Sequence, residues 1–131
     1  MSTKHYGMSV HTSLSLQDAE DQIRAALGTE GFGILTEIDV AATLEAKLGV
    51  QRRPYKILGA CNPTLAKQAL EADESIGLLL PCNVVVYEDE DGTVISAIEP
   101  LMMADLSPAV EEIADTAHDA LERALQQIPI G

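Results

Sequence analysis

The chain has 131 residues, of which 47% are hydrophobic and 3% are aromatic, and its 21 acidic against 8 basic residues give a net charge of −13. This length suits one domain, so residues 1–131 are expected to fold around a single core. Such negative charge repels phosphate backbones and anionic membrane surfaces, which argues against nucleic acid and membrane partners.

The N-terminal part of the chain predicts a strand, a helix and a second strand. Residues 4–12 alternate loosely between apolar and polar side chains, as in a strand with one wet face. Apolar residues then recur at helical spacing over residues 16–27, with Ser15 as the cap and glycines at the end. Residues 33–38 are typical of a strand.

A second helix and a third strand follow. Asp39 can cap a helix over residues 40–48, whose buried stripe is expected to be Val40, Leu44 and Leu48. Residues 55–60 are apolar and short enough for a strand. The pair Asn62 and Pro63 then predicts a helix start, because it combines a capping side chain with a residue that has no amide hydrogen to satisfy.

The C-terminal part predicts a hairpin and a long helix. Residues 76–87 are the most apolar stretch, and their second half should be a buried strand, with a bend at Pro81. An acidic turn leads to a returning strand over residues 93–98. Ser107 is expected to cap the last helix, which runs to about residue 128.

This order, β-α-β-α-β-α-β-β-α, indicates an α/β protein of the α+β type. Each helix has one apolar stripe, which favours a two-layer sandwich. We expect four helices on a mixed, mostly antiparallel sheet of about five strands, because the hairpin is antiparallel while helical connections permit parallel neighbours.

Three sequence strings closely resemble the domain of unknown function 302 family of bacteria and archaea. They are GFGILTEIDV at residues 31–40, PYKILGACNP at residues 54–63 and IGLLLPCNVVVYED at residues 76–89. The resemblance implies a single two-layer domain of this type that forms a homodimer. It brings with it no reaction and no cofactor, and no catalytic residue carries over.

Polar and thiol side chains follow two of the expected strands. Glu37 and Asp39 end one strand, and Cys61 and Asn62 end the next. If these strands were parallel neighbours, all four side chains would meet at one sheet edge, where ligands of open sheets bind. The two carboxylates could hold a cation or share a proton, although Asp39 also suits a plain helix cap, as does Asn62.

The two cysteines have different expected roles. Cys61 precedes a helix, where the positive end of the helix dipole favours a thiolate, so it is the candidate for catalysis; the alternative is a buried small hydrophobe. Cys82 should pack in the core. If their strands were parallel, Cys61 would lie at the end of one strand and Cys82 near the start of the next. That separation would disfavour a disulfide. We expect reduced thiols in the cytoplasm, because the N-terminus also lacks the apolar core of a signal peptide.

Basic residues cluster beside the third strand. Arg52, Arg53 and Lys56 are three of only eight in the chain. Arg52 and Lys56 could dock a carboxylate or phosphate of a small ligand, or could pair with nearby acids. The leading hypothesis is a dimeric domain that binds a small ligand or metal ion at the two strand ends. A thiol-dependent enzyme or redox protein using Cys61 is one alternative, and a protein interaction module is another.

Overall fold

The computed structural model describes residues 2–4 and 6–130, which form a six-stranded sheet with helices. In spatial order the strands are β1 (Ser2–Lys4), β2 (Gly7–Thr12), β6 (Gly92–Ile98), β5 (Cys82–Asp89), β4 (Tyr55–Cys61) and β3 (Gly33–Asp39). The five neighbouring pairs described are all antiparallel. The α+β class is therefore confirmed, while the parallel neighbours expected in a mixed sheet do not occur among the described strands.

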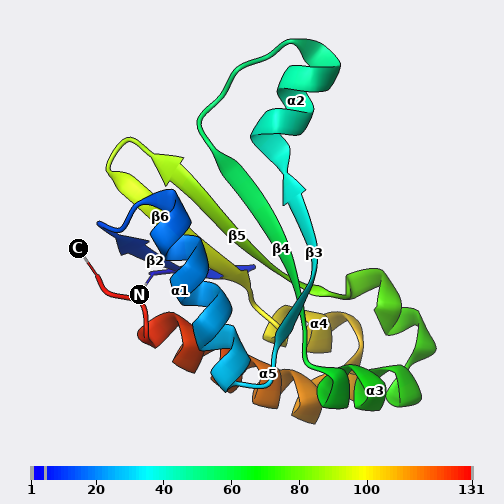
Figure 1. The fold of residues 1–131 in the computed structure, drawn as a ribbon. Coiled ribbons are helices and arrows are strands. Elements are labelled where there is room, and N and C mark those ends of the chain that lie inside the picture. The colour runs from blue at the N-terminus through cyan, green and yellow to red at the C-terminus, as the bar shows by residue number, and fades with distance from the viewer. Residues whose placement is uncertain (1, 5, 131) are drawn as a thin grey trace.

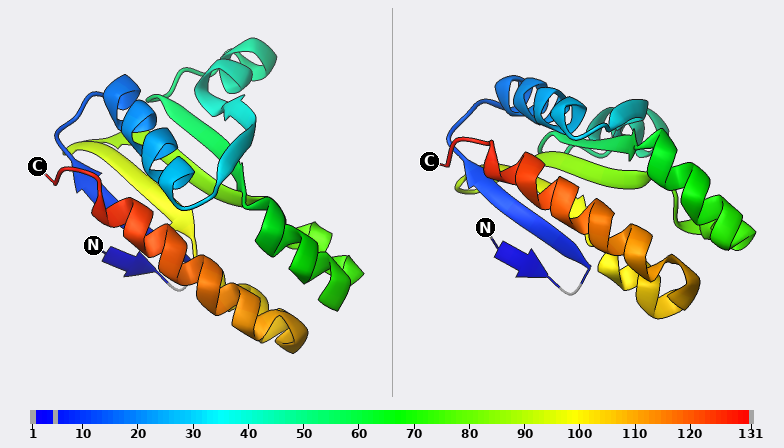
Figure 2. Two further views of the ribbon diagram at one scale, coloured as in Figure 1. Left: turned by 60° about the horizontal axis from the view of Figure 1, so that its bottom comes forward. Right: turned by 90° about the horizontal axis from the view of Figure 1, so that it is seen from below.

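Helices connect the strands and cover one face of the sheet. They are α1 (Leu16–Thr29), α2 (Val40–Leu48), α3 (Pro63–Ala72), α4 (Leu101–Leu106) and α5 (Glu111–Gln126), with short 3-10 helices η1 (Glu74–Leu79) and η2 (Pro108–Val110). Figure 1 places α2 and α3 at opposite ends of the molecule. α1 and α5 lie side by side against the sheet, which makes the two layers (Figure 2). Within the described ranges, no helix is long and apolar enough to cross a membrane.

The core lies between the sheet and these two helices. Successive side chains of a strand point to opposite faces, so each central strand buries one row of alternate residues against the helices. The largest fully buried side chains include Met8, Leu58, Val84, Val86 and Ile95 from the sheet and Ile23, Leu27, Leu121 and Leu125 from the helices. Each contributes about 1.5–3 kcal/mol through burial, so this core is the main source of stability.

Three of the four predicted helix caps are confirmed. The side chain of Ser15 accepts from the amide of Asp18 at 3.1 Å, and that of Asp39 accepts from the amide of Ala42 at 2.9 Å. The third cap, Asn62, begins α3. These starts were predictable because a cap needs only a few neighbouring residues.

The segments on either side of the hairpin differ from expectation. The first part of the apolar stretch at residues 76–87 forms η1, and β5 begins only after Pro81. The unpredicted α4 follows β6. Ser107 does not cap a helix: its side chain makes no capping bond, Pro108 opens the short η2, and α5 begins at Glu111. The Ser107 hydroxyl is instead a donor to Asp73.

The expected buried stripe of α2 is wrong. Within the described chain no side chain of α2 is buried, and Leu48 is 70% exposed. A helix that links parallel strands must run back along the sheet face. α2 does not pack there, and β4 therefore returns antiparallel to β3.

Candidate functional site

Antiparallel pairing of β3 and β4 separates the candidate residues into two groups. Asp39 pairs with Lys56, whereas Cys61 pairs with Gly33 at the other end of the same strands. The α2 end therefore holds Glu37, Asp39, Arg52 and Lys56, and the α3 end holds Cys61 and Asn62. The expected common site was wrong because it required parallel strands.

The charged candidates at the α2 end form an ion-pair network with α1. Lys56 Nζ donates to Glu37 Oε1 at 2.9 Å and to Glu20 Oε1 at 3.0 Å. Arg24 donates to the second oxygens of both carboxylates, at 2.7 Å and 2.9 Å respectively. The hydrogen bond from Lys56 lowers the pKa of Glu37, and the bonds to Glu37 and Glu20 raise the pKa of Lys56. Every oxygen of the two carboxylates has a cationic partner, so this network is structural.

Sequence reasoning missed Glu20 and Arg24. Glu20 is only 5% exposed and lies on the buried stripe of α1, next to Ala19 and Ile23. The sequence signal for Glu20 was an acidic residue within an apolar helical stripe. A carboxylate buried there needs a basic partner.

Asp39 and Arg52 also have local partners. Asp39 caps α2, and the Arg52 guanidinium lies 5.0 Å from the centre of the Tyr55 ring. Over residues 2–4 and 6–130 no group of three or more His, Cys, Asp or Glu side chains could hold a metal ion. Asp39 and Arg52 line one open surface pocket, whereas Glu37 and Lys56 pair with each other.

Asn62 joins two segments at the α3 end. Its Oδ1 accepts from the amide of Leu65 at 3.2 Å, and its Nδ2 donates to the carbonyl of Glu30 at 3.4 Å. Gly31, next to Glu30, has a φ of +83°, and a Cβ at this position would stand 3.0 Å from Asn62 Nδ2. Both the left-handed backbone and the close approach of Asn62 therefore favour glycine. Both polar groups of the Asn62 side chain are thus engaged within the protein.

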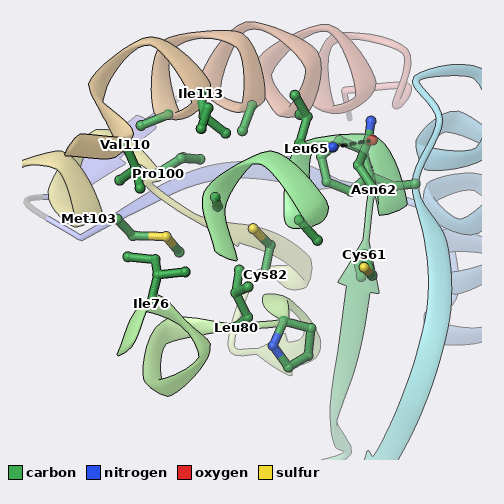
Figure 3. Close-up of a pocket in the computed structure, with 17 residues that line it drawn as sticks. Cys61, Asn62, Leu65, Ile76, Leu80, Cys82, Pro100, Met103, Val110 and Ile113 are labelled. Atoms are coloured by element: carbon green, nitrogen blue, oxygen red, sulfur yellow. Dashed lines mark hydrogen bonds between the residues drawn. The ribbon is translucent and has the colours of Figure 1, made fainter. Parts of the chain in front are cut away.

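An apolar pocket lies beside Cys61 and Asn62, where α3, α5 and the ends of β4 and β5 meet (Figure 3). Its cavity volume is about 50 Å³. The lining comprises Phe32, Ala60, Cys61, Asn62, Leu65, Ala66, Ala69, Ile76, Leu80, Pro81, Cys82, Pro100, Met103, Val110, Ile113, Ala114 and Ala117. This volume exceeds the roughly 10–15 Å³ that one water needs, and the wall is almost entirely apolar. The pocket therefore suits a small nonpolar molecule.

Comparison with known proteins places the fold in a family. The family model described as "Domain of unknown function DUF302" matches residues 8–128. The chain belongs to this family. A crystal structure of an uncharacterized conserved DUF302 protein from Bacillus stearothermophilus is similar, at 30% identity and a TM-score of 0.88, over 95% of this chain and 99% of that one. No curated protein sequence matches the chain.

The two cysteines of this DUF302 domain lie on neighbouring strands at the pocket. Cys82 pairs with Ala60, so Cys61 is one residue out of direct register with it. The separation expected between them was wrong, again because it assumed parallel strands. Both are free thiols. Cys82 is 8% exposed, which confirms its packing role, and burial, with a smaller effect of nearby Cys61, raises its pKa to about 11. Cys82 is therefore a protonated thiol at neutral pH.

Proposed function

We propose that this DUF302 domain binds a small apolar molecule in the pocket between α3 and α5. The supporting observation is the chemistry of the wall. Among the described residues that line the pocket, Asn62 alone has a side-chain nitrogen or oxygen, and both are already hydrogen-bonded. A polar group of a ligand would lose water there without a new partner, at a cost of roughly 2–7 kcal/mol. Apolar surface instead gains about 25 cal/mol for each Å² buried.

Binding fits the geometry better than metal capture or catalysis. Of the two carboxylates proposed for a metal, Glu37 is paired with Lys56 and Arg24, and Asp39 caps α2. Cys61 does line the pocket beside the start of α3. However, the described lining contains no histidine, carboxylate or amine that could exchange a proton with its thiol. A thiol-dependent reaction would therefore lack an acid or base from this wall.

Benzene is a stringent probe of the pocket: dry apolar protein cavities of about 150 Å³ bind it, so the wall must move for a cavity of about 50 Å³ to admit it. We expect benzene to shift the NMR methyl signals of Ile76, Met103 and Val110, with a Kd of the order of 1 mM. Ala114→Leu adds three carbons to the pocket wall and should weaken binding at least tenfold.

The matched control is Ala25→Leu, which adds the same atoms to the exposed surface of α1 and should leave the Kd unchanged. Absence of methyl shifts at saturating benzene would overturn the binding proposal. So would equal shifts in the Ala114→Leu variant, since the ligand would then lie elsewhere.

We also propose that the domain works as a homodimer joined through an arm, defined as residues 33–54. The arm comprises β3, α2 and the loop after it. β3 ends the sheet, so its outer backbone groups lack a neighbouring strand within the described fold. Four large apolar side chains of the arm are exposed, namely Leu35, Ile38, Leu48 and Val50. Edge strands of two identical chains can pair antiparallel about a twofold axis.

Charge supports a second copy as the partner of the arm. The arm holds three basic and three acidic residues and so has no net charge, whereas the whole chain has a net charge of −13. Two copies of the arm can therefore meet about a twofold axis without the like-charge repulsion that the rest of the acidic chain would bring. A nine-residue helix is also too short to be stable alone, which favours a packed partner for α2.

Light scattering at micromolar concentration tests the dimer. The native chain should give twice the monomer mass of 14.0 kDa. Leu48→Glu should give a monomer, because it places a charge in the proposed contact. Leu78→Glu changes an even more exposed leucine, at 88% against 70%, outside the arm and should remain dimeric. A monomeric native chain, or a dimeric Leu48→Glu variant, contradicts assembly through the arm.

A reducing, cytoplasmic setting completes the proposal. Two free thiols stand on neighbouring strands, one of them at the pocket edge and only partly buried. Such thiols persist where glutathione and thioredoxin systems keep cysteines reduced.

A further inference from the structure

Two short segments form part of the pocket wall, and they come from distant parts of the chain. The first wall segment, residues 73–81, contains η1 and contributes Ile76, Leu80 and Pro81. The second wall segment, residues 99–110, contains α4 and η2 and contributes Pro100, Met103 and Val110. Figure 3 shows Ile76 and Met103 next to each other on one side of the pocket.

One hydrogen bond fastens the two wall segments together. Ser107 Oγ donates to Asp73 Oδ2 at 2.7 Å, and Ser107 is only 9% exposed. The other oxygen of Asp73 accepts from the amide of Ser75 at 3.0 Å, which holds the carboxylate in place. Within the part of the chain that the structure describes, no other hydrogen bond joins these segments.

Apolar packing and the base of the second segment hold the wall to the body of the domain. Ile76, Met103 and Val110 share a small buried cluster, and Glu99 bonds to His118 on α5 at 2.7 Å. η1 and α4 have six residues each, and each buries one side chain, Ile76 and Met103 respectively. Short helices with few buried contacts open at a lower free-energy cost than the core of a domain. Between the two segments themselves, the charge-assisted Ser107–Asp73 hydrogen bond is the directional contact that adds to the apolar packing of Ile76 and Met103.

We infer that the Ser107–Asp73 hydrogen bond is a latch that controls access to the apolar pocket. When it breaks, the two wall segments part and a ligand enters or leaves; when it re-forms, the pocket closes. The role in ligand exchange rests on the proposed function, but the motion of the wall does not. Loss of the latch raises the rates of entry and exit together, and so changes exchange more than affinity.

Alkylation of Cys82 reports this opening without any ligand. Cys82 lines the pocket and is 8% exposed, so iodoacetamide reaches it when the wall opens. All variants carry Cys61→Ser, which leaves one reactive thiol. Ser107→Ala should raise the alkylation rate about tenfold, the loss expected for one hydrogen bond to a charged group. Ser107→Thr, which keeps the hydroxyl, should restore most of the native rate.

Ser96→Ala is the matched control, because it removes the 2.8 Å hydrogen bond between Ser9 and Ser96 on β2 and β6, away from the pocket. Equal alkylation rates in Ser107→Ala and Ser96→Ala would overturn the latch. Asp73→Asn, which removes the charge at the acceptor, gives a second reading and should also accelerate alkylation. Faster alkylation in a protein that binds no benzene would refute the ligand proposal and leave the latch standing. Benzene binding, with alkylation and exchange rates in Ser107→Ala equal to those of the native protein, would support the ligand proposal and refute the latch.

Discussion

Gly59→Ala should destabilise the domain by about 3 kcal/mol, near the upper end of the cost of overpacking. Gly59 lies on β4 opposite the irregular pairing of β3 at Ile34 and Thr36. A Cβ there would collide with Thr36 Oγ1 and would stand 2.9 Å from Cγ of Pro81. The Pro81 ring is fixed to its backbone and cannot move away cheaply, and the exposed Thr36 side chain has to change its χ1 rotamer.

Thermal unfolding measures this effect, and the melting temperature should fall by roughly 10 °C in a domain of this size. Gly33→Ala is the matched control on the neighbouring strand, since a Cβ there meets nothing within 4 Å, and it should change stability by less than about 0.5 kcal/mol. Adding Thr36→Ala to Gly59→Ala should recover part of the loss, because it removes one of the two collisions. Equal melting temperatures for Gly59→Ala and Gly33→Ala would contradict the close approach of β3 and Pro81 to β4.

Lys56→Met should cost about 2 kcal/mol at neutral pH, because it leaves the nearly buried Glu20 with Arg24 as its sole partner. Lys67→Met is the matched control. Its ion pair with Glu71 is 2.7 Å long but both side chains are mostly exposed, so its removal should cost less than about 0.5 kcal/mol. Chemical denaturation compares the two variants, and similar losses would mean that the Lys56 network contributes no more than a surface pair.

The pH dependence of the stability loss in Lys56→Met follows from the shifted pKa values of Lys56 and Glu37. The folded-state pKa of Lys56 is raised above 10.5, so its contribution is present below pH 10.5 and is lost as pH rises through the folded-state pKa. The folded-state pKa of Glu37 is lowered below 4.5, so its contribution is present above pH 4.5 and is lost as pH falls through that lower value. The stability difference between native and Lys56→Met proteins should therefore be level across neutral pH and shrink at both extremes.

Local signals predicted local structure well. Each confirmed cap, at Ser15, Asp39 and Asn62, depends on a side chain and an amide three residues later. The cap expected at Ser107 failed because a tertiary contact with Asp73, 34 residues away, takes its hydroxyl. A sequence pattern contains no information about that competition.

Strand direction could not be predicted in the same way. A helix between two strands is compatible with either direction, and the choice depends on whether the helix packs on the sheet. The apolar residues of α2 suggested that it does. None of them is buried in the described fold, however, and the antiparallel pairing of β3 and β4 separates the candidate residues. The same exposure now supports the proposed dimer contact of the arm.

The pocket was only partly predictable. Cys61 and Asn62, which the sequence pattern singled out, do line the pocket beside the start of α3, but most of the wall comes from segments spread between residues 32 and 117. The available signal was small residues at helical spacing on two helices, namely Ala66 and Ala69 on α3 and Ala114 and Ala117 on α5. Small side chains on facing helices leave space between them, but only the tertiary structure shows that they face each other.

A crystal of the native protein pressurised with xenon tests the central claim most directly, because xenon enters dry apolar cavities and is visible as a single heavy atom. The account predicts one strong xenon peak among Cys82, Ala114 and Met103, and no such peak in Ala114→Leu. A pocket that contains ordered water in place of xenon, or xenon bound only elsewhere, would contradict it.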